Sequence, residues 1–447
     1  MITAAQIERA LRSHRLPGLE EGLPSEEFVF PNYGDYSLVR VPATLAGLLG
    51  LEMEGAMPPL PPSLWADLAP GVRHILFILV DAVGYTCFRL ILETGSGLRR
   101  LTQAGRVFPL SAVFPTSTVA SLPSLWTGTP PTVHGFVGPE SWEHAVNKGP
   151  SLPLRGLIPP PYLRVADLLI KRRLPGNLLS PPNLALPLTK AGVQIVAFFY
   201  LPPPGNGLPR LLLRGTKRFS PNGVRGVESF IAFRDFYDFR EMWANVREVL
   251  LQYRQEPLFL VVYWSGTDLL GHLYGPEGGP FRRALRCMDQ TLESFLDSLP
   301  PAVREGTLLV FTSDHGMVQT PPDRAIRLSG HRALRRMLRR PPAGEPRMIG
   351  LHVRPDRTDA LRAYVAERLG DRFLLLETER VLAAGLFGPD GASAPIQEQL
   401  GGLLLVARGD ARLIFEKEAA PLYGQHGGLS PEEMLVPLLM ARLDGEI

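Results

Sequence analysis

The stretch His74-Ile-Leu-Phe-Ile-Leu-Val80, followed at once by Asp81, decides how this chain folds. A continuous apolar run of this length is typical of a strand that is buried on both faces of a parallel sheet. Runs of the same kind recur along the chain at 194–200, 258–264 and 307–312. Helical patterns lie between them, for example at 237–253 and 282–299. This alternation predicts an α/β fold with a central, mostly parallel sheet and helices on both faces.

The 447 residues suggest one large α/β domain with added segments rather than a minimal core. We expect an N-terminal helical and loop extension at 1–70, with helices at 4–13 and 42–49. The catalytic domain would then span 71–447. Proline-rich or weakly periodic sequence interrupts the alternation and predicts cap insertions around 141–193, 205–235 and 318–400. Further short strands are expected at 348–353, 373–377, 402–407 and 412–415.

Composition narrows the possible partners and the location. The 47 basic and 44 acidic residues leave a net charge of +3, which gives no electrostatic basis for binding a nucleic-acid polymer. The longest apolar run is a strand length, so no membrane association is expected. Cys87 and Cys287 lie far apart without a CxxC pattern, and the N-terminal residues lack an apolar core followed by a cleavage site. We therefore expect a cytoplasmic protein.

Acidic side chains follow three of the four apolar runs. Asp81 comes directly after 74–80, Asp268 follows 258–264, and the pair Asp314-His315 follows 307–312. In an open α/β sheet, ligands bind beyond the carboxyl ends of the strands, so these side chains should converge. Carboxylates packed together repel one another unless a cation lies between them. The sequence therefore predicts a metal site at this edge of the sheet.

The spacing of the candidate ligands supports this prediction. Asp268 and His272 are four residues apart, which places both on one side of a helical turn. Asp314 and His315 are adjacent, so they need an irregular loop, which Gly316 would permit. His426 lies in the loop Gly-Gln-His-Gly-Gly. Mixed nitrogen and oxygen ligands suit zinc, with manganese or iron as competitors, and this many ligands would hold two divalent ions about 4 Å apart.

The segment 114–128, Phe-Pro-Thr-Ser-Thr-Val-Ala-Ser-Leu-Pro-Ser-Leu-Trp-Thr-Gly, supplies hydroxyl groups just before a predicted helix. A helix N-terminus favours an anion, because its free N–H groups and its dipole are positive. A metal-bound threonine hydroxyl there can be deprotonated and can attack phosphorus. Pro123 removes one hydrogen bond from a helix that begins at Val119, so we expect a later start at Ser121 or a bend.

Taken together, these motifs resemble the alkaline phosphatase superfamily and, within it, the type I phosphodiesterase/nucleotide pyrophosphatase family. The resemblance runs from Asp81 to His426 in the family's order. It is carried by Leu-Val-Asp81-Ala-Val-Gly, Phe-Pro-Thr-Ser-Thr118, Thr-Gly-x-x-Pro-x-x-His134-Gly, Asp268-x-x-Gly-His272, Ser-Asp314-His315-Gly-Met and Gly-x-His426-Gly-Gly. It implies an alkaline-phosphatase-like sandwich with a central sheet and an inserted cap.

The resemblance also implies roles for the site residues. One zinc ion would be held by Asp268, His272 and His426, and the other by Asp81, Asp314 and His315. Thr118 would bridge to the second ion as the nucleophile and form a phosphothreonine intermediate that water then hydrolyses. Thr118 is preferred because its spacing to Thr127-Gly128 matches the family's nucleophile, and Thr116 is the second choice. The substrate would be a small phosphoester.

Two departures from the family pattern concern the choice of substrate. The aromatic residue that often follows the nucleophile is replaced by Val119, and no asparagine follows His134-Gly until Asn147. A phosphodiesterase/nucleotide pyrophosphatase is the first choice of function, with a phosphomonoesterase or phosphonate hydrolase as the alternative. A sulfatase is disfavoured because neither cysteine lies in a Cys-x-Pro-x-Arg context, and a mutase would usually offer serine. A non-catalytic metal-binding scaffold is the alternative from another class.

Several of these residues also have purely structural interpretations. Asp81 alone could cap a helix, and single histidines such as His272 or His426 are often ordinary core or surface residues. For His134 we expect a structural hydrogen bond rather than a ligand role. We also expect the aromatic residues at 198–200 to lie in the core, and the arginine run at 332–340 to form a solvated helix face. The joint occurrence of the motifs favours the metal site.

Overall fold

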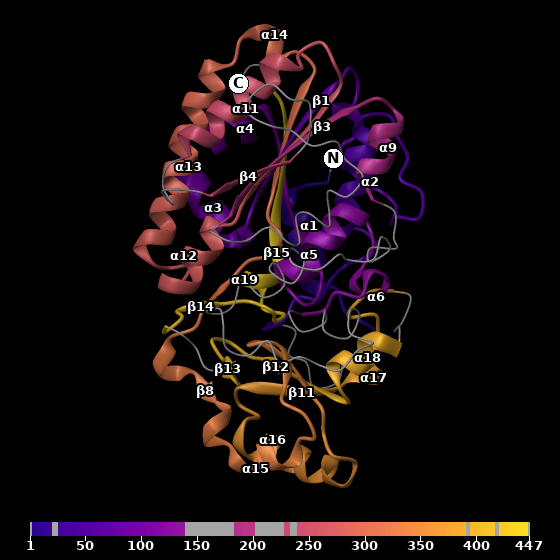
Figure 1. Ribbon diagram of the computed structural model, residues 1–447, viewed down its shortest axis with the longest axis vertical. Coiled ribbons are helices and arrows are strands. Elements are labelled where there is room, and N and C mark those ends of the chain that lie inside the picture. The colour runs from indigo at the N-terminus through magenta and orange to yellow at the C-terminus, as the bar shows by residue number, and fades with distance from the viewer. Residues whose placement is uncertain are drawn as a thin grey trace.

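The computed structural model describes residues 2–19, 26–138, 183–201, 228–232, 239–389, 394–415 and 420–445. Most of the insertion expected at 141–193, including Asn147, lies outside these residues, as does most of that expected at 205–235. The described residues form a large α/β body around a seven-stranded sheet and a smaller lobe around a four-stranded sheet. Figure 1 shows the lobe, coloured orange to yellow, below the main sheet.

The main sheet has the strand order β2-β15-β6-β1-β5-β3-β4. Its strands are β1 (His74–Val80), β2 (Gly105–Ser111), β3 (Gln194–Leu201), β4 (Glu228–Ala232), β5 (Leu258–Trp264), β6 (Thr307–Thr312) and β15 (Leu435–Arg442). β15 is antiparallel to both of its neighbours, and the other pairs are parallel. Val80 pairs with Trp264, and Leu79 pairs with Thr312. The central strands therefore end at one edge, and the prediction of a mostly parallel sheet is confirmed.

Helices cover both faces of this sheet, because both faces of β1 are apolar. Ile75, Phe77 and Leu79 belong to one core and Leu76, Ile78 and Val80 to the other, and each fully buried side chain contributes about 1.5–3 kcal/mol. The first core is covered by α1 (Ala4–Ser13), α2 (Val41–Leu48), α5 (Thr118–Thr127) and α9 (Ala185–Lys190). The second is covered by α3 (Tyr85–Thr94), α4 (Gly97–Ala104), α11 (Arg240–Gln252) and α13 (Gly279–Ser298). The expected helices thus form within a few residues of their predicted bounds.

The first seventy residues pack directly on the main body. In α1, Ile7 and Leu11 lie on one face of the helix and are fully buried in the same core as β1. The backbone N–H of Val29 donates to the carbonyl of Leu429 at 2.8 Å. The described part of the expected extension at 1–70 therefore shares the core of the catalytic domain, and its boundary at residue 70 stays a prediction.

Within the insertion expected at 205–235, residues 228–232 form β4, the edge strand of the main sheet. β4 pairs with β3 only, from Ala197 opposite Glu228 to Leu201 opposite Ala232. An edge strand needs backbone hydrogen bonds on one side alone, so it does not require the continuous apolar run that marks the central strands. This placement differs from the sequence expectation, because these five residues belong to the sheet rather than to a cap.

The smaller lobe is built around the antiparallel sheet β11-β12-β10-β9 and has a core of its own. Its strands are β9 (Ala343–Glu345), β10 (Met348–Leu351), β11 (Phe373–Glu377) and β12 (Leu403–Ala407), and its helices include α15 (Arg332–Met337) and α16 (Thr358–Arg368). Because β12 lies in the centre of this sheet, the lobe extends beyond the insertion expected at 318–400. β10, β11 and β12 confirm three of the expected short strands.

The remaining α-helices and strands of the described residues are short. They are α6 (Pro131–His134), α12 (Gly266–Tyr274), α14 (Pro301–Arg304), α17 (Thr378–Ala383), α18 (Ala394–Leu400), α19 (Pro431–Met434), β7 (Val318–Gln319), β8 (Ile326–Arg327), β13 (Leu413–Ile414) and β14 (Gly424–Gln425). In Figure 1, α5, α12 and α19 lie between the main sheet and the lobe. No helix among the described residues is both long and apolar enough to cross a bilayer.

Two structural interpretations are confirmed. Phe198, Phe199 and Tyr200 of β3 are buried in the two cores of the main sheet. In α15, Leu334 is buried while Arg335 and Arg336 are exposed. The arginine run therefore covers the lobe with a solvated helix face, as expected.

Candidate active site and metal centre

Asp81 begins the site at the end of β1. Its backbone N–H donates to the carbonyl of Trp264, which continues the parallel ladder by one residue. The next residue, Ala82, has a φ of 59° and is the only non-glycine residue with positive φ in the described part of the chain. The Ala82 N–H donates to Asp314 Oδ1 at 3.2 Å. Backbone strain of this kind is concentrated at functional sites, and here it turns the chain so that the two carboxylates meet.

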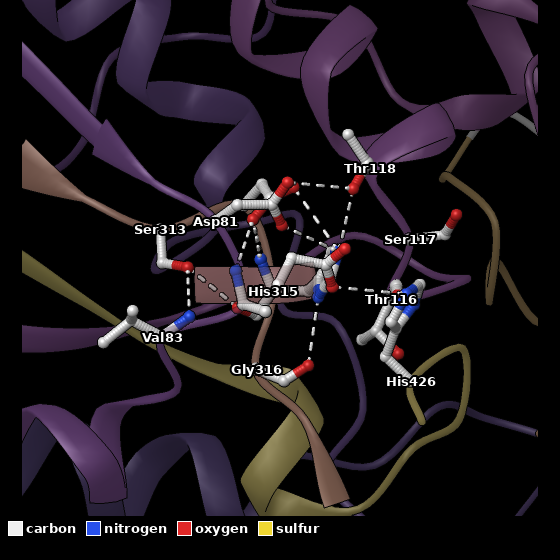
Figure 2. A network of polar contacts seen from close by, with 12 residues as sticks. Asp81, Val83, Thr116, Ser117, Thr118, Ser313, His315, Gly316 and His426 are labelled. Atoms are coloured by element: carbon white, nitrogen blue, oxygen red, sulfur yellow. Dashed lines mark hydrogen bonds and ion pairs between the residues drawn. The ribbon is translucent and has the colours of Figure 1, made fainter. Parts of the chain in front are cut away.

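Asp314 and His315 lie in the loop that follows β6. Ser313 holds this loop, because its hydroxyl accepts from the Val83 N–H at 2.9 Å and donates to the His315 carbonyl at 2.8 Å. The pair is therefore tied to the loop after β1, as Figure 2 shows. Gly316 is required for a reason other than the expected backbone freedom. A Cβ at this position would lie 1.9 Å from the Glu432 carbonyl oxygen, so close packing of two backbones excludes a side chain.

Asp268 and His272 lie on α12, which begins directly after β5. One helical turn separates them, and His272 Nε2 is 3.4 Å from Asp268 Oδ1. Both side chains are almost fully buried. The expected use of a single helical turn to bring this carboxylate and this imidazole together is confirmed.

His426 reaches the same edge from the C-terminal part of the chain. β15 is antiparallel to β6, so the residues that precede β15 lie where the parallel strands end. His426 Nε2 is 3.8 Å from Asp268 Oδ1. The ring of His426 stacks on that of His315, with centroids 4.1 Å apart. The structure thus brings together residues from four separate segments of the chain.

All three histidines are oriented in the same way. The Nδ1 atom of His272 faces the Gly424 carbonyl at 2.8 Å, that of His315 faces the Gly316 carbonyl at 3.0 Å, and that of His426 faces the Thr116 carbonyl at 2.9 Å. A carbonyl oxygen can only accept, so each Nδ1 carries the hydrogen and each Nε2 is left to face the carboxylates, where in a neutral ring it offers a lone pair. This arrangement, with Nδ1–H bound to backbone, is the one that metal-ligating histidines use.

The electrostatics of the cluster also favour a cation. Burial, followed by the charges of Asp314 and Asp268, raises the pKa of Asp81 well above its ordinary value. Burial, followed by the charge of Asp314, likewise raises the pKa of Asp268. Burial lowers the pKa of His426 to about 4, so this ring is neutral near pH 7. Without a cation the carboxylates repel one another, whereas neutral imidazoles are ready to act as ligands.

The donor atoms form two overlapping groups of metal-ligand geometry. One contains Asp81, Asp314 and His315, and the other contains Asp268, His315 and His426. The first matches the set that the family resemblance implied. In the second, His315 takes the place expected for His272, while His272 lies beside Asp268.

Three buried carboxylate oxygens are aimed into this cluster and lack a hydrogen bond within the described part of the structure. They are Asp81 Oδ1, Asp268 Oδ1 and Asp314 Oδ2. Unsatisfied buried carboxylate oxygens are costly, and a bound cation satisfies them. The residues present therefore fit divalent metal binding. The mixture of carboxylate oxygen and imidazole nitrogen suits zinc, manganese or iron.

Three adjacent hydroxyl groups lie at the start of α5, on Thr116, Ser117 and Thr118, and only that of Thr118 faces the cluster. The Thr118 hydroxyl lies 3.1 Å from His315 Nε2 and 3.5 Å from Asp81 Oδ2, and it is half-buried. Thr116 is fully buried, and its hydroxyl donates to the Gly428 carbonyl and accepts from the Gly427 N–H. Figure 2 shows Thr118 directed at Asp81 and His315, with Thr116 beside His426. The geometry thus favours the first choice of nucleophile over the second.

The helix that carries Thr118 differs slightly from the expected one. α5 begins at Thr118 itself and contains Pro123, so the helix tolerates the proline rather than starting at Ser121. The side chain of His134 lies beneath α5, where its Nε2 bonds the Ser124 hydroxyl at 2.9 Å. Burial lowers the pKa of His134 to about 3, so the ring stays neutral. This confirms the structural role expected for His134.

Two residues at the site, Tyr263 and Glu345, carried no signal in the sequence. The Tyr263 hydroxyl donates to Asp81 Oδ2, and burial raises the pKa of Tyr263 well above its ordinary value. Glu345 of the lobe accepts a hydrogen bond from the Ser117 hydroxyl at 2.7 Å. Tyr263 lies within an apolar run, and Glu345 lies in a stretch of sequence rich in glycine and proline. Neither pattern distinguishes a site residue from an ordinary one.

The chain matches the family model for type I phosphodiesterase/nucleotide pyrophosphatase over residues 75–428. Among curated proteins, it is 34% identical over 103 residues to the bis(5'-adenosyl)-triphosphatase ENPP4 of Bos taurus, which is 23% of each protein. It is 35% identical over 86 residues to venom phosphodiesterase 2 of Crotalus adamanteus, covering 18% of this chain and 11% of that one. It is 34% identical over 77 residues to the alkaline phosphatase PhoV of Synechococcus elongatus, covering 17% and 14%. These alignments span a quarter or less of each curated relative.

Solved structures share the fold. The murine ectonucleotide pyrophosphatase/phosphodiesterase 5 superposes with a TM-score of 0.55 at 16% identity, covering 81% of this chain and 87% of that chain. The human protein of the same name gives a TM-score of 0.56 at 16% identity, covering 82% and 87%. A further murine structure of that protein is an inactive threonine-to-alanine variant in complex with AMP. At this identity the likeness establishes the fold of the chain.

Proposed function

Because the chain belongs to the type I phosphodiesterase/nucleotide pyrophosphatase family, we propose that it is a metal-dependent hydrolase of small phosphoesters, with phosphodiesters as the preferred class. One observation carries the proposal. The Thr118 hydroxyl lies at the edge of a buried cluster in which three carboxylates face three imidazole Nε2 lone pairs.

The proposed metal ligands are the predicted ones. Asp81, Asp314 and His315 would hold one ion, and Asp268, His272 and His426 the other, with His315 close enough to contribute to both. Two divalent ions, which we propose to be zinc, supply positive charge that lowers the pKa of a hydroxyl and stabilises phosphoryl oxygens.

Thr118 is the proposed nucleophile. Its hydroxyl loses a proton, and Oγ1 forms a bond to phosphorus while the bond from phosphorus to the leaving oxygen breaks. The leaving oxygen takes up a proton and departs as an alcohol, and a phosphothreonine results. The N-terminus of α5 offers backbone N–H groups and a positive dipole end to the phosphoryl oxygens. A water then attacks the same phosphorus, which restores the Thr118 hydroxyl and releases a phosphate monoester.

The rest of the site holds these groups in place. Tyr263 donates to Asp81 and fixes the orientation of that carboxylate beside the nucleophile. The three Nδ1–H···O=C bonds fix the imidazoles, so that each Nε2 keeps its direction. Because these bonds hold the candidate ligands in place before a substrate binds, little reorganisation of the site is required.

The test is replacement of the nucleophile. In Thr118→Ala, hydrolysis of bis-p-nitrophenyl phosphate should fall by about a thousandfold or more, while the zinc content per chain stays at the wild-type value. Thr118→Ser should retain part of the activity, because it keeps a hydroxyl. Mass spectrometry of quenched wild-type reactions should find a phosphoryl group on the peptide that contains Thr118. Undiminished activity of the alanine variant would remove Thr118 from the mechanism.

Phosphomonoester hydrolysis is the second candidate within the same site chemistry. It is favoured by the similarity to the alkaline phosphatase PhoV, which is as close in identity as the diesterases. The rates on p-nitrophenyl phosphate and on bis-p-nitrophenyl phosphate distinguish the two. The phosphonate hydrolase alternative is tested by adding a phosphonate monoester to the same assay.

A non-catalytic metal-binding scaffold is the alternative from another class. It would bind zinc without cleaving any ester in the panel, whereas the nucleophile positioned beside the ligands favours catalysis. The cytoplasmic location expected from the sequence also remains a proposal, and fractionation of the source cells would test it.

A further inference from the structure

One buried carboxylate near the site is not used by the proposed mechanism. Glu345 ends β9 of the lobe, and its side chain is 9% exposed. Its Oε1 accepts a hydrogen bond of 2.7 Å from the Ser117 hydroxyl. Ser117 immediately precedes Thr118, so Glu345 is hydrogen-bonded to the chain neighbour of the proposed nucleophile.

The charge of Glu345 reaches both sides of the cluster. Burial and the charge of Asp314 raise the pKa of Asp268 most, and the charge of Glu345 raises it further. Burial lowers the pKa of His426, and the charge of Glu345 offsets part of that lowering. Glu345 is nevertheless absent from both groups of metal-ligand geometry found among the described residues. It therefore acts on the site as a nearby charge and not as part of the ligand cluster.

The fold makes room for this carboxylate. A Cβ built on Gly427 would lie 2.5 Å from the Cβ of Glu345 and 3.0 Å from its Cγ. Gly427 also has a φ of 115°, which L side chains rarely adopt. Both the available space and the backbone conformation therefore require glycine at position 427, next to the candidate ligand His426. Glu345 occupies the volume that a side chain at this position would fill.

The charges of the site decide what this arrangement does. Two bound divalent cations would outweigh the three carboxylates of Asp81, Asp268 and Asp314 by a single positive charge, and the nearby carboxylate of Glu345 would cancel that charge. A phosphate monoester carries close to two negative charges above pH 7, whereas a diester carries one. The carboxylate of Glu345 therefore repels a doubly charged monoester more strongly than a singly charged diester.

We propose that Glu345 is a specificity-determining residue that selects singly charged phosphodiesters over doubly charged phosphomonoesters. The lobe supplies this residue, so the lobe would set the charge preference of a catalytic centre that lies on the main sheet. This inference rests on the proposed function, because it assumes that the phosphoryl group binds beside Thr118.

The test compares the binding of two anions by zinc-loaded protein at pH 8, measured by isothermal titration calorimetry. The probes are inorganic phosphate, which is mainly doubly charged, and dimethyl phosphate, which is singly charged. In Glu345→Gln the dissociation constant for phosphate should fall about tenfold more than that for dimethyl phosphate. Glu345→Asp keeps the charge and should resemble the wild type. Glu377→Gln, an exposed glutamate of the same sheet, is the matched control and should change neither constant.

Each other outcome overturns the inference. Charge selection by Glu345 would be excluded if Glu345→Gln changed the dissociation constants of both anions equally or changed neither. It would also be excluded if no variant bound phosphate measurably. Loss of zinc from Glu345→Gln, with zinc retained by Glu377→Gln, would make Glu345 a support of the metal ligands instead. Binding needs no turnover, so charge-selective binding by a wild type that hydrolyses neither nitrophenyl ester would support the inference while the proposed function fails.

Discussion

Replacing Arg347 by methionine should both destabilise the protein and loosen the metal centre. The guanidinium of Arg347 forms two bonds to Glu433, at 2.8 and 3.0 Å, and both side chains are fully buried. A third bond runs from Arg347 to the Ala411 carbonyl. Methionine keeps most of the volume but leaves the Glu433 charge buried without a counterion. Breaking such a pair from one side costs about 3–5 kcal/mol of folding free energy.

The same substitution should reach the ligands, because Glu433 holds both loops that carry them. Its Oε1 accepts from the Gly428 N–H at 2.7 Å, two residues after His426. Its backbone carbonyl accepts from the Gly316 N–H at 2.9 Å, directly after His315. Supports of this kind typically contribute a factor of 10–100 in metal affinity. We therefore expect zinc affinity to fall by about that factor in Arg347→Met.

The assay is urea unfolding of zinc-free and zinc-loaded protein, together with competition for zinc against a chelator. Arg408→Met is the matched control, because its pair with Glu27 is 29% and 38% exposed and should contribute less than about 1 kcal/mol. A loss below about 1 kcal/mol in Arg347→Met, with unchanged zinc affinity, would refute the reasoning.

This prediction also has a pH dependence. Burial raises the pKa of Glu433, but the charge of Arg347 and the hydrogen bonds to Glu433 outweigh burial and hold it below the ordinary 4.5. A depressed carboxyl pKa contributes stability above the unfolded-state value, and this contribution is lost as the pH falls through the folded-state value. The stability difference between wild type and Arg347→Met should therefore narrow below about pH 4.5, and a difference that widens there would contradict the assignment.

Two further predictions concern the cluster itself. Tyr263→Phe removes the hydroxyl of β5 that donates to Asp81, so kcat should fall about tenfold. Circular dichroism should show that the variant remains folded, and an unchanged kcat would exclude a positioning role for Tyr263. Zinc binding should release protons, because the pKa values of Asp81 and Asp268 are raised in the ion-free protein. Calorimetry at pH 6 in two buffers of different ionisation enthalpy would give different binding enthalpies, and identical enthalpies would contradict the raised pKa values.

The central sheet was predictable because burial on both faces leaves a mark in the local sequence. His74–Val80 and Leu258–Trp264 are continuous apolar runs, and the structure places them side by side in parallel. β4 was missed because an edge strand is held by its backbone and needs no such run. The lobe was expected only in outline, since its strands are short and belong to a small core of their own.

The candidate ligands were predictable for a similar reason. Asp81, Asp268 and Asp314 each follow a strand or begin the helix after it, so local sequence and the rule for strand ends place them at one edge. His426 needed the resemblance to a known family, because nothing near it in sequence shows that β15 runs antiparallel. Which hydroxyl faces the cluster was left open by the residues alone. Thr116 and Thr118 are two positions apart, and only their hydrogen bonds separate them.

Short-range patterns of apolar and polar residues are enough to predict the α/β class and the strand ends that carry Asp81, Asp268 and Asp314, and the family resemblance adds the remaining candidate metal ligands. Which nitrogen two of the three histidines turn toward the cluster, and which charges surround the cluster, depend on contacts between segments that are far apart in the chain. Tyr263, Glu345 and the Arg347–Glu433 pair reach the site from distant segments. Their influence depends on distances across the fold, and electrostatic energy in a buried site is set by those distances rather than by neighbours in the chain.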